Sequence, residues 1–190
     1  GTRTEVVPNI DAQADADLAL SNGAEWCGLL RTEFLFLGRE TAPDEDEQAR
    51  SYQAIASALN GAPVTIRTLD VGGDKSAPFL SLPPEDNPAM GLRGVRVSLW
   101  RPELLKVQLR AILRVRPRGQ CRILIPVVAS VEELIAVRAL VDTCRVDTNY
   151  PDAIEVGVMI ETPAAAMTAD LLAAHADFLS VGTTDLTQYA

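Results

Sequence analysis

Charged side chains that could bind an anion and a metal ion follow several apolar runs of the sequence. Arg31 ends the run WCGLLR, Arg67 ends VTIR, and Lys75 follows a Gly-Gly-Asp turn shortly afterwards. Glu161 and Asp185 follow two later apolar runs. Arginine binds phosphate and carboxylate groups bidentately, lysine acts as a point charge, and two carboxylates with water and a substrate oxygen commonly hold Mg²⁺. These residues predict a site for Mg²⁺ and a small anion that carries phosphate and carboxylate groups.

Each of these residues also has an alternative interpretation without a ligand. The stretch RTLDVGGDKSAPFL (67–80) could be a polar loop between a strand and a helix. Glu161 and Asp185 could each cap the helix that follows. Arg93 and Arg96, in GLRGVR, could extend the anion site, and Arg96 could equally form a salt bridge on a helix surface. The combination of cations and carboxylates at successive strand ends favours a binding site.

The apolar runs are continuous rather than alternating, which is typical of parallel strands buried on both faces. Helical patterns lie between them, at 11–21, at 43–59, from Pro102, and after a capping-box pair formed by Ser130 and Glu133. The chain therefore predicts repeated βα units. The predicted strands are 6–10, 26–31, 64–68, 121–127, 154–161 and 178–184.

The order of elements predicts an α/β fold of the (β/α)₈ TIM-barrel type. No GxGxxG turn follows the first strand, so an open dinucleotide-binding sheet is disfavoured. About six of the eight βα units of such a barrel are present, and we expect residues 1–190 to form one incomplete barrel domain. In a barrel the strand ends open on one face, and neighbouring strands are ~4.8 Å apart. Arg31, Arg67, Glu161 and Asp185 should therefore surround one opening.

Composition excludes several classes of protein. The net charge of −9 argues against a nucleic-acid surface, because phosphate backbones require a positive field. No run reaches the ~18–20 apolar residues of a membrane span, and the first residues lack a signal-peptide pattern, which predicts a cytoplasmic protein. Cys27, Cys121 and Cys144 have no CxxC spacing, so we expect them to pack as small apolar side chains.

Five stretches together closely resemble the phosphoenolpyruvate (PEP)-binding barrel of enzyme I of the bacterial sugar phosphotransferase system, a PEP-protein phosphotransferase: GAEWCGLLRTEFLF, RTLDVGGDK, NPAMGLRGVR, VMIETPAAA and FLSVGTTDLTQY. Pyruvate phosphate dikinase and PEP synthase share looser versions. The resemblance covers nearly the whole chain in the right order. It implies a barrel that binds PEP and Mg²⁺, passing the phosphoryl group to a histidine on a separate domain and then to the carrier HPr.

The resemblance also implies a role for each matched residue. Arg31 and Arg67 would hold the phosphate and act in catalysis, with Lys75 assisting and Arg93 as a further contact. Glu161 of ETPAA and Asp185 of DLTQ would ligate Mg²⁺. Catalysis would consist of positioning and charge neutralisation by the metal and the arginines.

Three features depart from the family pattern. Thr184 stands where the family's GTND motif has an asparagine, which predicts weaker or altered PEP binding because a hydroxyl is shorter and offers one donor. The sequence stops before an arginine and a proton-donating cysteine of the family. The only histidine, His175, lies at a helix end and reads as structural. We therefore expect a truncated piece without a phosphohistidine domain, inactive by itself.

Parts of the sequence also fit two other functions, and the incomplete barrel has one physical consequence. Thr184 favours a regulatory domain that senses PEP without turnover. A Mg²⁺-dependent, pyruvate-class carbon-carbon lyase also pairs an ETP-like glutamate with a later aspartate, but RTEFLF, VGGDK and DLTQY fit it poorly. The unpaired edges of an incomplete barrel predict self-association into a homo-oligomer or marginal stability.

Overall fold

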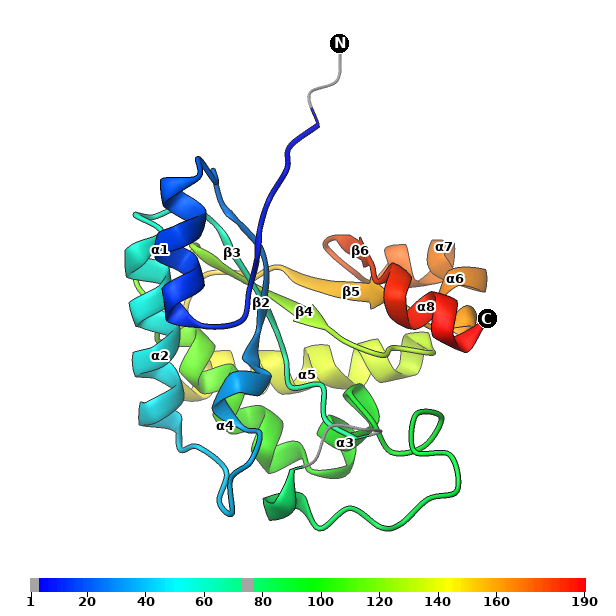
Figure 1. The fold of residues 1–190 in the computed structure, drawn as a ribbon. Helices are drawn as coiled ribbons and strands as arrows, with labels where there is room; N and C mark the ends of the chain where they lie inside the picture. Colours follow the sequence, from blue (N-terminus) through cyan, green and yellow to red (C-terminus); the bar gives the residue numbers. More distant parts are fainter. Residues whose placement is uncertain (1–3, 73–76) are drawn as a thin grey trace.

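The computed structural model describes residues 4–72 and 77–190, and within them every side chain except that of Gln13. Six parallel strands form one sheet in the order β1 to β6, which curls into a half-barrel (Figure 1). The predicted α/β fold with about six βα units is confirmed. The strands are β1 (Asn9–Ile10), β2 (Cys27–Arg31), β3 (Val64–Arg67), β4 (Cys121–Ile125), β5 (Val156–Ile160) and β6 (Leu179–Val181).

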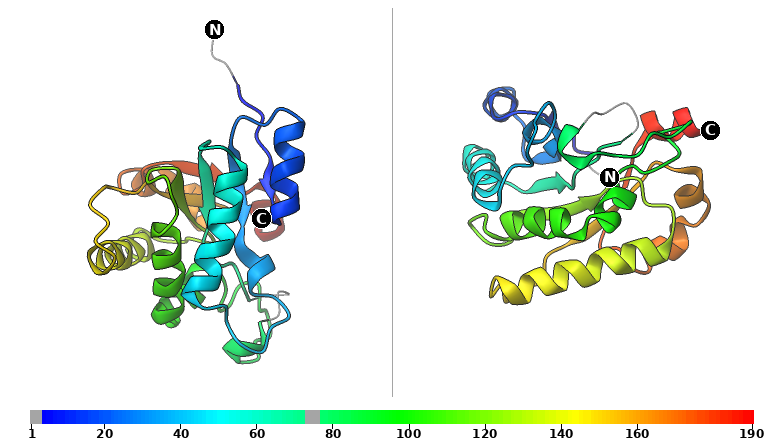
Figure 2. Two further views of the ribbon diagram at one scale, coloured as in Figure 1. Left: turned by 90° about the vertical axis from the view of Figure 1, so that its left-hand side faces the viewer. Right: turned by 90° about the horizontal axis from the view of Figure 1, so that it is seen from below.

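The main helices cover the outer side of the curled sheet (Figure 2). None of the helices in the described part of the chain is long and apolar enough to cross a lipid bilayer. The helices are α1 (Gln13–Ser21), α2 (Glu45–Ala58), α3 (Val95–Trp100), α4 (Pro102–Leu113), α5 (Val131–Asp147), α6 (Pro163–Met167), α7 (Ala169–Ala173) and α8 (Thr183–Tyr189), with 3₁₀ turns η1 (Thr32–Leu35) and η2 (Pro78–Leu80).

Helices α4 and α5 begin at the positions that the sequence predicts. The backbone N–H of Glu133 donates to Ser130 Oγ and the Glu133 carboxylate accepts from the Ser130 N–H, which completes the predicted capping box of α5. Pro102 occupies the first turn of α4, where its missing N–H costs nothing. These local signals fix where the helices begin, and hence which face each presents to the sheet.

Alternating side chains of each strand separate the core from the inner face of the half-barrel. In β3, Val64 and Ile66 join the core between sheet and helices, whereas Thr65 and Arg67 line a cavity on the inner face. Cys27, Cys121 and Cys144 all belong to that core, as predicted, and burial raises the pKa of the Cys27 thiol to about 12. The inner face is therefore available for polar residues.

The end of the chain differs from the prediction. The predicted sixth strand, 178–184, is a strand only at Leu179–Val181, and α8 begins at Thr183. Asp185 therefore lies in the first turn of a helix rather than at a strand end. The helix N-terminus favours a carboxylate there, and β6 is an outer strand with only one neighbouring strand to hold it. The first strand is also shorter than predicted, with two residues.

We expect the chain to self-associate through its outer strands. Among the described residues, β1 and β6 each pair with one strand, and the Val181 side chain in β6 is 64% exposed. Sedimentation velocity over a concentration series should show a rising average mass. Val181→Lys should reduce this association, because a charged edge residue opposes strand pairing. Val146→Lys, at an exposed position in α5 away from the sheet edges, is the control. A concentration-independent monomer would contradict the prediction.

Candidate functional site

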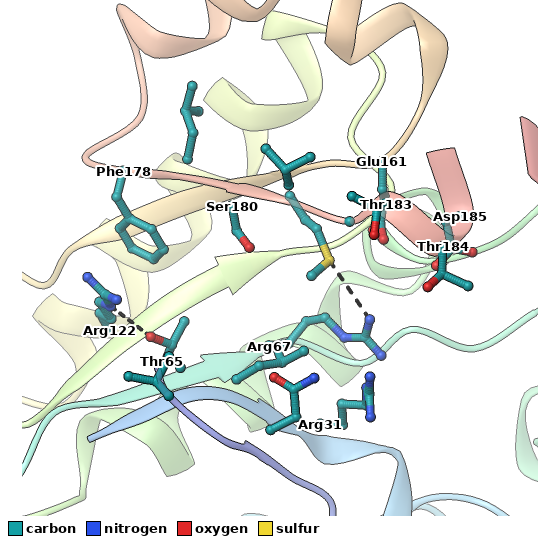
Figure 3. Close-up of a pocket in the computed structure, with 18 of the residues that line it drawn as sticks. Arg31, Thr65, Arg67, Arg122, Glu161, Phe178, Ser180, Thr183, Thr184 and Asp185 are labelled. Carbon is teal, nitrogen blue, oxygen red and sulfur yellow. Dashed lines mark hydrogen bonds between the residues drawn. The ribbon is translucent and has the colours of Figure 1, made fainter. Parts of the chain in front are cut away.

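A cavity of about 410 Å³ opens on the inner face of the half-barrel (Figure 3). An adjoining cavity of about 490 Å³ shares several of its residues and adds Glu33. The structure thus brings together most of the residues that the sequence predicts for the site. Lys75 lies outside the described residues. The predicted site residues that line the first of these cavities are Arg31, Arg67, Glu161, Thr184 and Asp185.

Arg31 and Arg67 occupy paired positions on neighbouring strands, where their Cα atoms are register partners. Two like charges at such positions repel each other. Arg31 turns to Asp11, and its Nη1 donates to both carboxylate oxygens at 3.1 Å. Both side chains of this pair are substantially exposed, so the pairing is weak. Arg31 is therefore free to exchange Asp11 for a ligand.

Arg67, in contrast, is almost completely buried. Its Nη2 lies 3.2 Å from Glu33 Oε1 and 3.7 Å from Asp70 Oδ2. Burial opposes the charged form, but the carboxylates of Glu33, Asp70 and Glu161 outweigh it and raise the pKa of Arg67, which stays charged. Its Nε has no hydrogen-bond partner among the described residues. Arg67 is a fixed cation at the cavity wall.

Glu33 connects Arg67 to the following loop. Its Oε1 also accepts a hydrogen bond of 2.9 Å from the backbone N–H of Asp70. Glu33 lies in η1, two residues after Arg31. One short turn therefore positions both Arg31 and the carboxylate that contacts Arg67 of the neighbouring strand. Its Oε2 is buried without a partner among the described residues. Glu33 thereby fixes both the side chain of Arg67 and the loop that leaves β3.

Arg93 pairs with the residue predicted to bind metal. Its Nε and Nη2 donate to the two oxygens of Asp70 at 3.1 and 3.2 Å, and Nη2 also donates to Asp185 Oδ1 at 2.7 Å. Burial opposes its charge, but Asp70 and Asp185 raise the pKa of Arg93. Its Nη1 reaches Tyr189 Oη at 3.3 Å. In the absence of ligand, Arg93 thus neutralises Asp185 and ties α8 to the loop after β3.

Gly72 permits the chain to pass closely behind Arg93. It has φ +107°, and a Cβ at this position would lie 2.3 Å from Leu92 O and 2.9 Å from Arg93 Cα. Any other residue would be strained and would displace the backbone that carries Arg93. This close approach explains one glycine of the VGGDK stretch.

Glu161 is a buried carboxylate held by the chain beside it. Its Oε1 accepts a hydrogen bond of 2.7 Å from the backbone N–H of Val127, a residue with φ 55°. This conformation is strained for a β-branched residue, and it aims the N–H at the carboxylate. Burial, together with Asp70 and Asp185, raises the pKa of Glu161 to about 7, although the Val127 N–H and Arg67 act in the opposite direction.

The donor set fits Mg²⁺ that is shared with a substrate. Glu161 and Asp185 offer hard oxygen ligands, and Mg²⁺ usually keeps water and takes one or two carboxylates plus a substrate oxygen. Across the described ranges there is no group of three or more His, Cys, Asp or Glu residues that could form a complete protein cage. Within the described residues, the buried carboxylates of Glu33, Asp70 and Glu161 and the half-buried carboxylate of Asp185 also outnumber the buried guanidiniums of Arg67 and Arg93, so a cation would be favoured.

Two residues weighed in the sequence lie away from this cluster. Arg96 is half-buried in α3, and its Nε and Nη2 have no partner among residues 4–72 and 77–190, so the surface salt bridge considered for it is not found there. His175 is exposed in the turn after α7, where its backbone N–H donates to Leu172 O.

A buried polar network behind the arginines was missed by the sequence analysis. Gln108 in α4 donates hydrogen bonds to Thr32 in η1 and to Tyr52 in α2. One signal was available: Gln108 occupies a position of the apolar stripe of α4, three residues after Leu105 and one before Leu109. A polar residue at a core position requires a buried partner.

Comparison with known proteins yields one family and several relatives. A family model described as "PEP-utilising enzyme, PEP-binding domain" matches residues 1–190. The chain is 51% identical over 190 residues to a multiphosphoryl transfer protein of Rhodobacter capsulatus, and 45% identical over 194 residues to a phosphoenolpyruvate-protein phosphotransferase of Haemophilus influenzae. The matches cover the whole chain but only 23% and 34% of these relatives.

A solved structure supports the fold. A citrate lyase from Burkholderia xenovorans superposes with a TM-score of 0.57 at 17% identity, and the match covers 99% of this chain and 52% of that one. At this identity the likeness concerns the arrangement of strands and helices.

The raised pKa of Glu161 predicts a pH-dependent stability in the metal-free protein. The folded state holds this proton up to about pH 7, whereas the unfolded chain releases it near 4.5, so the free energy of unfolding falls as the pH rises between these values. Glu161→Gln should lack this pH dependence, which in the unmodified chain changes the free energy of unfolding by up to about 3 kcal/mol. Urea unfolding at pH 4.5 and 7.5 with a chelator measures it. Exposed Glu155→Gln is the control, and an unchanged slope in Glu161→Gln would contradict the prediction.

Proposed function

Since the chain belongs to the family of PEP-binding domains of PEP-utilising enzymes, we propose that its cavity binds phosphoenolpyruvate together with Mg²⁺. We further propose that residues 1–190 make up a single domain of this kind. One observation carries the proposal. Arg31 and Arg67 lie on one wall of the same cavity whose other wall carries Glu161 and Asp185.

The chemistry of PEP matches this division of charge. Its phosphate and carboxylate groups are anionic, so they require donors with positive charge and are best held by bidentate guanidiniums. Arg31 is the mobile partner that would leave Asp11 for the phosphate, and Arg67 is the fixed partner. The Thr184 hydroxyl lies in the same cavity and would donate to the substrate. Lys75 is retained as an assisting cation.

The metal would be held by Glu161 and Asp185. When bound, Mg²⁺ would neutralise the charge that develops on the phosphoryl oxygens. Asp185 must first exchange Arg93, which is then released to serve as the further phosphate contact. The residues of the chain thereby bind, orient and neutralise, which is most of what phosphoryl transfer requires from a protein.

We propose that the parent protein is a phosphotransferase. Its curated relatives carry the names phosphoenolpyruvate-protein phosphotransferase and multiphosphoryl transfer protein. The phosphoryl group would pass to a histidine outside these residues and then to HPr, since His175 is exposed away from the cavity cluster. A PEP-sensing domain without turnover is the second candidate, and Thr184 favours it, because its short hydroxyl provides one donor.

Calorimetry should detect PEP binding in the presence of Mg²⁺, and Arg31→Ala should weaken it by tenfold or more. Loss of a charged hydrogen bond is worth about 1.5–3 kcal/mol. Arg31 is preferable to Arg67 for this test, because removing Arg67 would leave buried carboxylates unpaired and damage the fold. Exposed Arg50→Ala in α2 should bind normally. Absence of PEP binding by the unmodified chain would refute the proposed function.

The residue at position 184 should tune the affinity. Thr184→Asn supplies an amide with two donors on a longer side chain, and one additional hydrogen bond is worth about 1 kcal/mol, or roughly fivefold in affinity. Calorimetric titration with PEP and Mg²⁺ should show this gain. Thr187→Asn, at an exposed position of α8 outside the cavity lining, should leave the affinity unchanged. Equal or weaker binding by Thr184→Asn would argue against a direct contact with the substrate.

A further inference from the structure

Gln108 uses its whole amide group to join the segments that follow β2 and β3. Its Oε1 accepts a hydrogen bond of 2.9 Å from the backbone N–H of Leu69. Its Nε2 donates to Thr32 Oγ1 at 3.1 Å and to Tyr52 Oη at 3.0 Å. The side chain is buried, with an exposed fraction of 1%, so none of these bonds has water as a ready substitute. The Gln108 side chain in α4 therefore binds the segments after β2 and β3 at the same time.

The network continues to the backbone of Arg67. The Thr32 hydroxyl that accepts from Gln108 donates in turn to Arg67 O at 3.0 Å. On the other side, Tyr52 Oη donates to Gln48 Oε1 at 3.1 Å, and Gln48 Nε2 donates to Pro43 O at 2.9 Å. The chain of bonds thus runs from the start of α2, through α4, to the strand end that carries the buried arginine.

We propose that Gln108 is a positioning residue for the anion site: it fixes the segments 31–33 and 67–70 relative to each other, and so sets where Arg31, Glu33 and Arg67 stand. Its effect on a ligand rests on the proposed PEP binding. Its effect on the two segments does not.

The two segments need a contact that holds them in place, because the arginines they carry repel each other. Arg31 and Arg67 are register partners that repel each other, and the ladder between β2 and β3 ends at this pair. Beyond it the chain enters η1 on one side and a long loop on the other. Past the strand ladder, the described contacts besides Gln108 that join these segments are those of Glu33 with Asp70 and Arg67 and the bond from Thr32 to Arg67 O. A rigid helix that supplies the support keeps the guanidiniums apart at a set distance.

A merely structural role must be distinguished from positioning, and Gln120 provides the matched control. It is also buried, and its Nε2 donates to Ala56 O at 2.7 Å and Ala62 O at 3.0 Å. Gln120 precedes β4, at the opposite end of the strands from the site. Gln120→Leu therefore removes buried hydrogen bonds of the same kind without touching the segments that carry the arginines.

The first measurement is amide hydrogen exchange without ligand, read at Asp70. Its N–H bonds to Glu33 and not to Gln108, so it reports whether the two segments stay together. Gln108→Leu should speed this exchange by about tenfold, whereas Gln120→Leu should leave it unchanged at a similar loss of melting temperature. Equal exchange rates at Asp70 in the two variants would overturn the positioning role, regardless of whether the chain binds PEP.

The second measurement is calorimetry with PEP and Mg²⁺. Gln108→Leu should weaken binding by about tenfold, the usual size of a supporting-residue effect, and Gln120→Leu should bind as the unmodified chain does. Thr32→Val should resemble Gln108→Leu, and Thr32→Ser, which keeps the hydroxyl, should restore affinity. Normal affinity in both Gln108→Leu and Thr32→Val would overturn the proposal. If the unmodified chain itself fails to bind PEP, the proposed function fails, and the exchange result still decides whether Gln108 positions the segments.

Discussion

The side-by-side placement of Arg31 and Arg67 is the constraint on which the site depends. Their Cα atoms are register partners on strands ~4.8 Å apart, so two guanidiniums that extended side by side would repel each other. The protein meets this repulsion in two different ways. Arg67 is buried against Glu33 and Asp70, and Arg31 reaches out to exposed Asp11. The same solution creates one preorganised cation and one adaptable cation, which is a useful division for capturing an anion that arrives from solvent.

The opposite wall of the cavity carries carboxylates in place of arginines. Glu161 is buried and its pKa is raised to about 7, and the Val127 N–H that holds it belongs to a strained backbone position. Strain at a β-branched residue persists only where surrounding contacts enforce it. Here it provides a donor that keeps a desolvated carboxylate in place. A divalent cation would relieve the repulsion among Glu161, Asp70 and Asp185 and would draw the two walls together through a shared anion.

The sequence predicted the meeting of these residues because a parallel sheet brings all its strand ends to one face, and Arg31, Arg67 and Glu161 each follow a recognisable strand. Asp185 was predicted at a strand end and lies in a helix, because β6 ends at Val181 and α8 begins at Thr183. The pairing of Arg93 with Asp185 joins residues 92 positions apart, and no local pattern encodes it. Gln108 could have been noticed as a polar residue in an apolar stripe, but its partners depend on how three helices and loops pack.

The pairing of Arg93 with Asp185 would make the proposed ligand binding an exchange rather than an addition. Tyr189 donates to Ala89 O and accepts from Arg93, so α8 and the loop that precedes α3 are joined to the same guanidinium. A metal ion on Asp185 would have to displace Arg93, and an anion on Arg93 would free Asp185 for the metal. Each ligand would then lower the cost of binding the other, which is positive coupling. Arg67 is held by Glu33 and the Gln108 network, so it would keep its position while Arg93 and Asp185 exchange their partners.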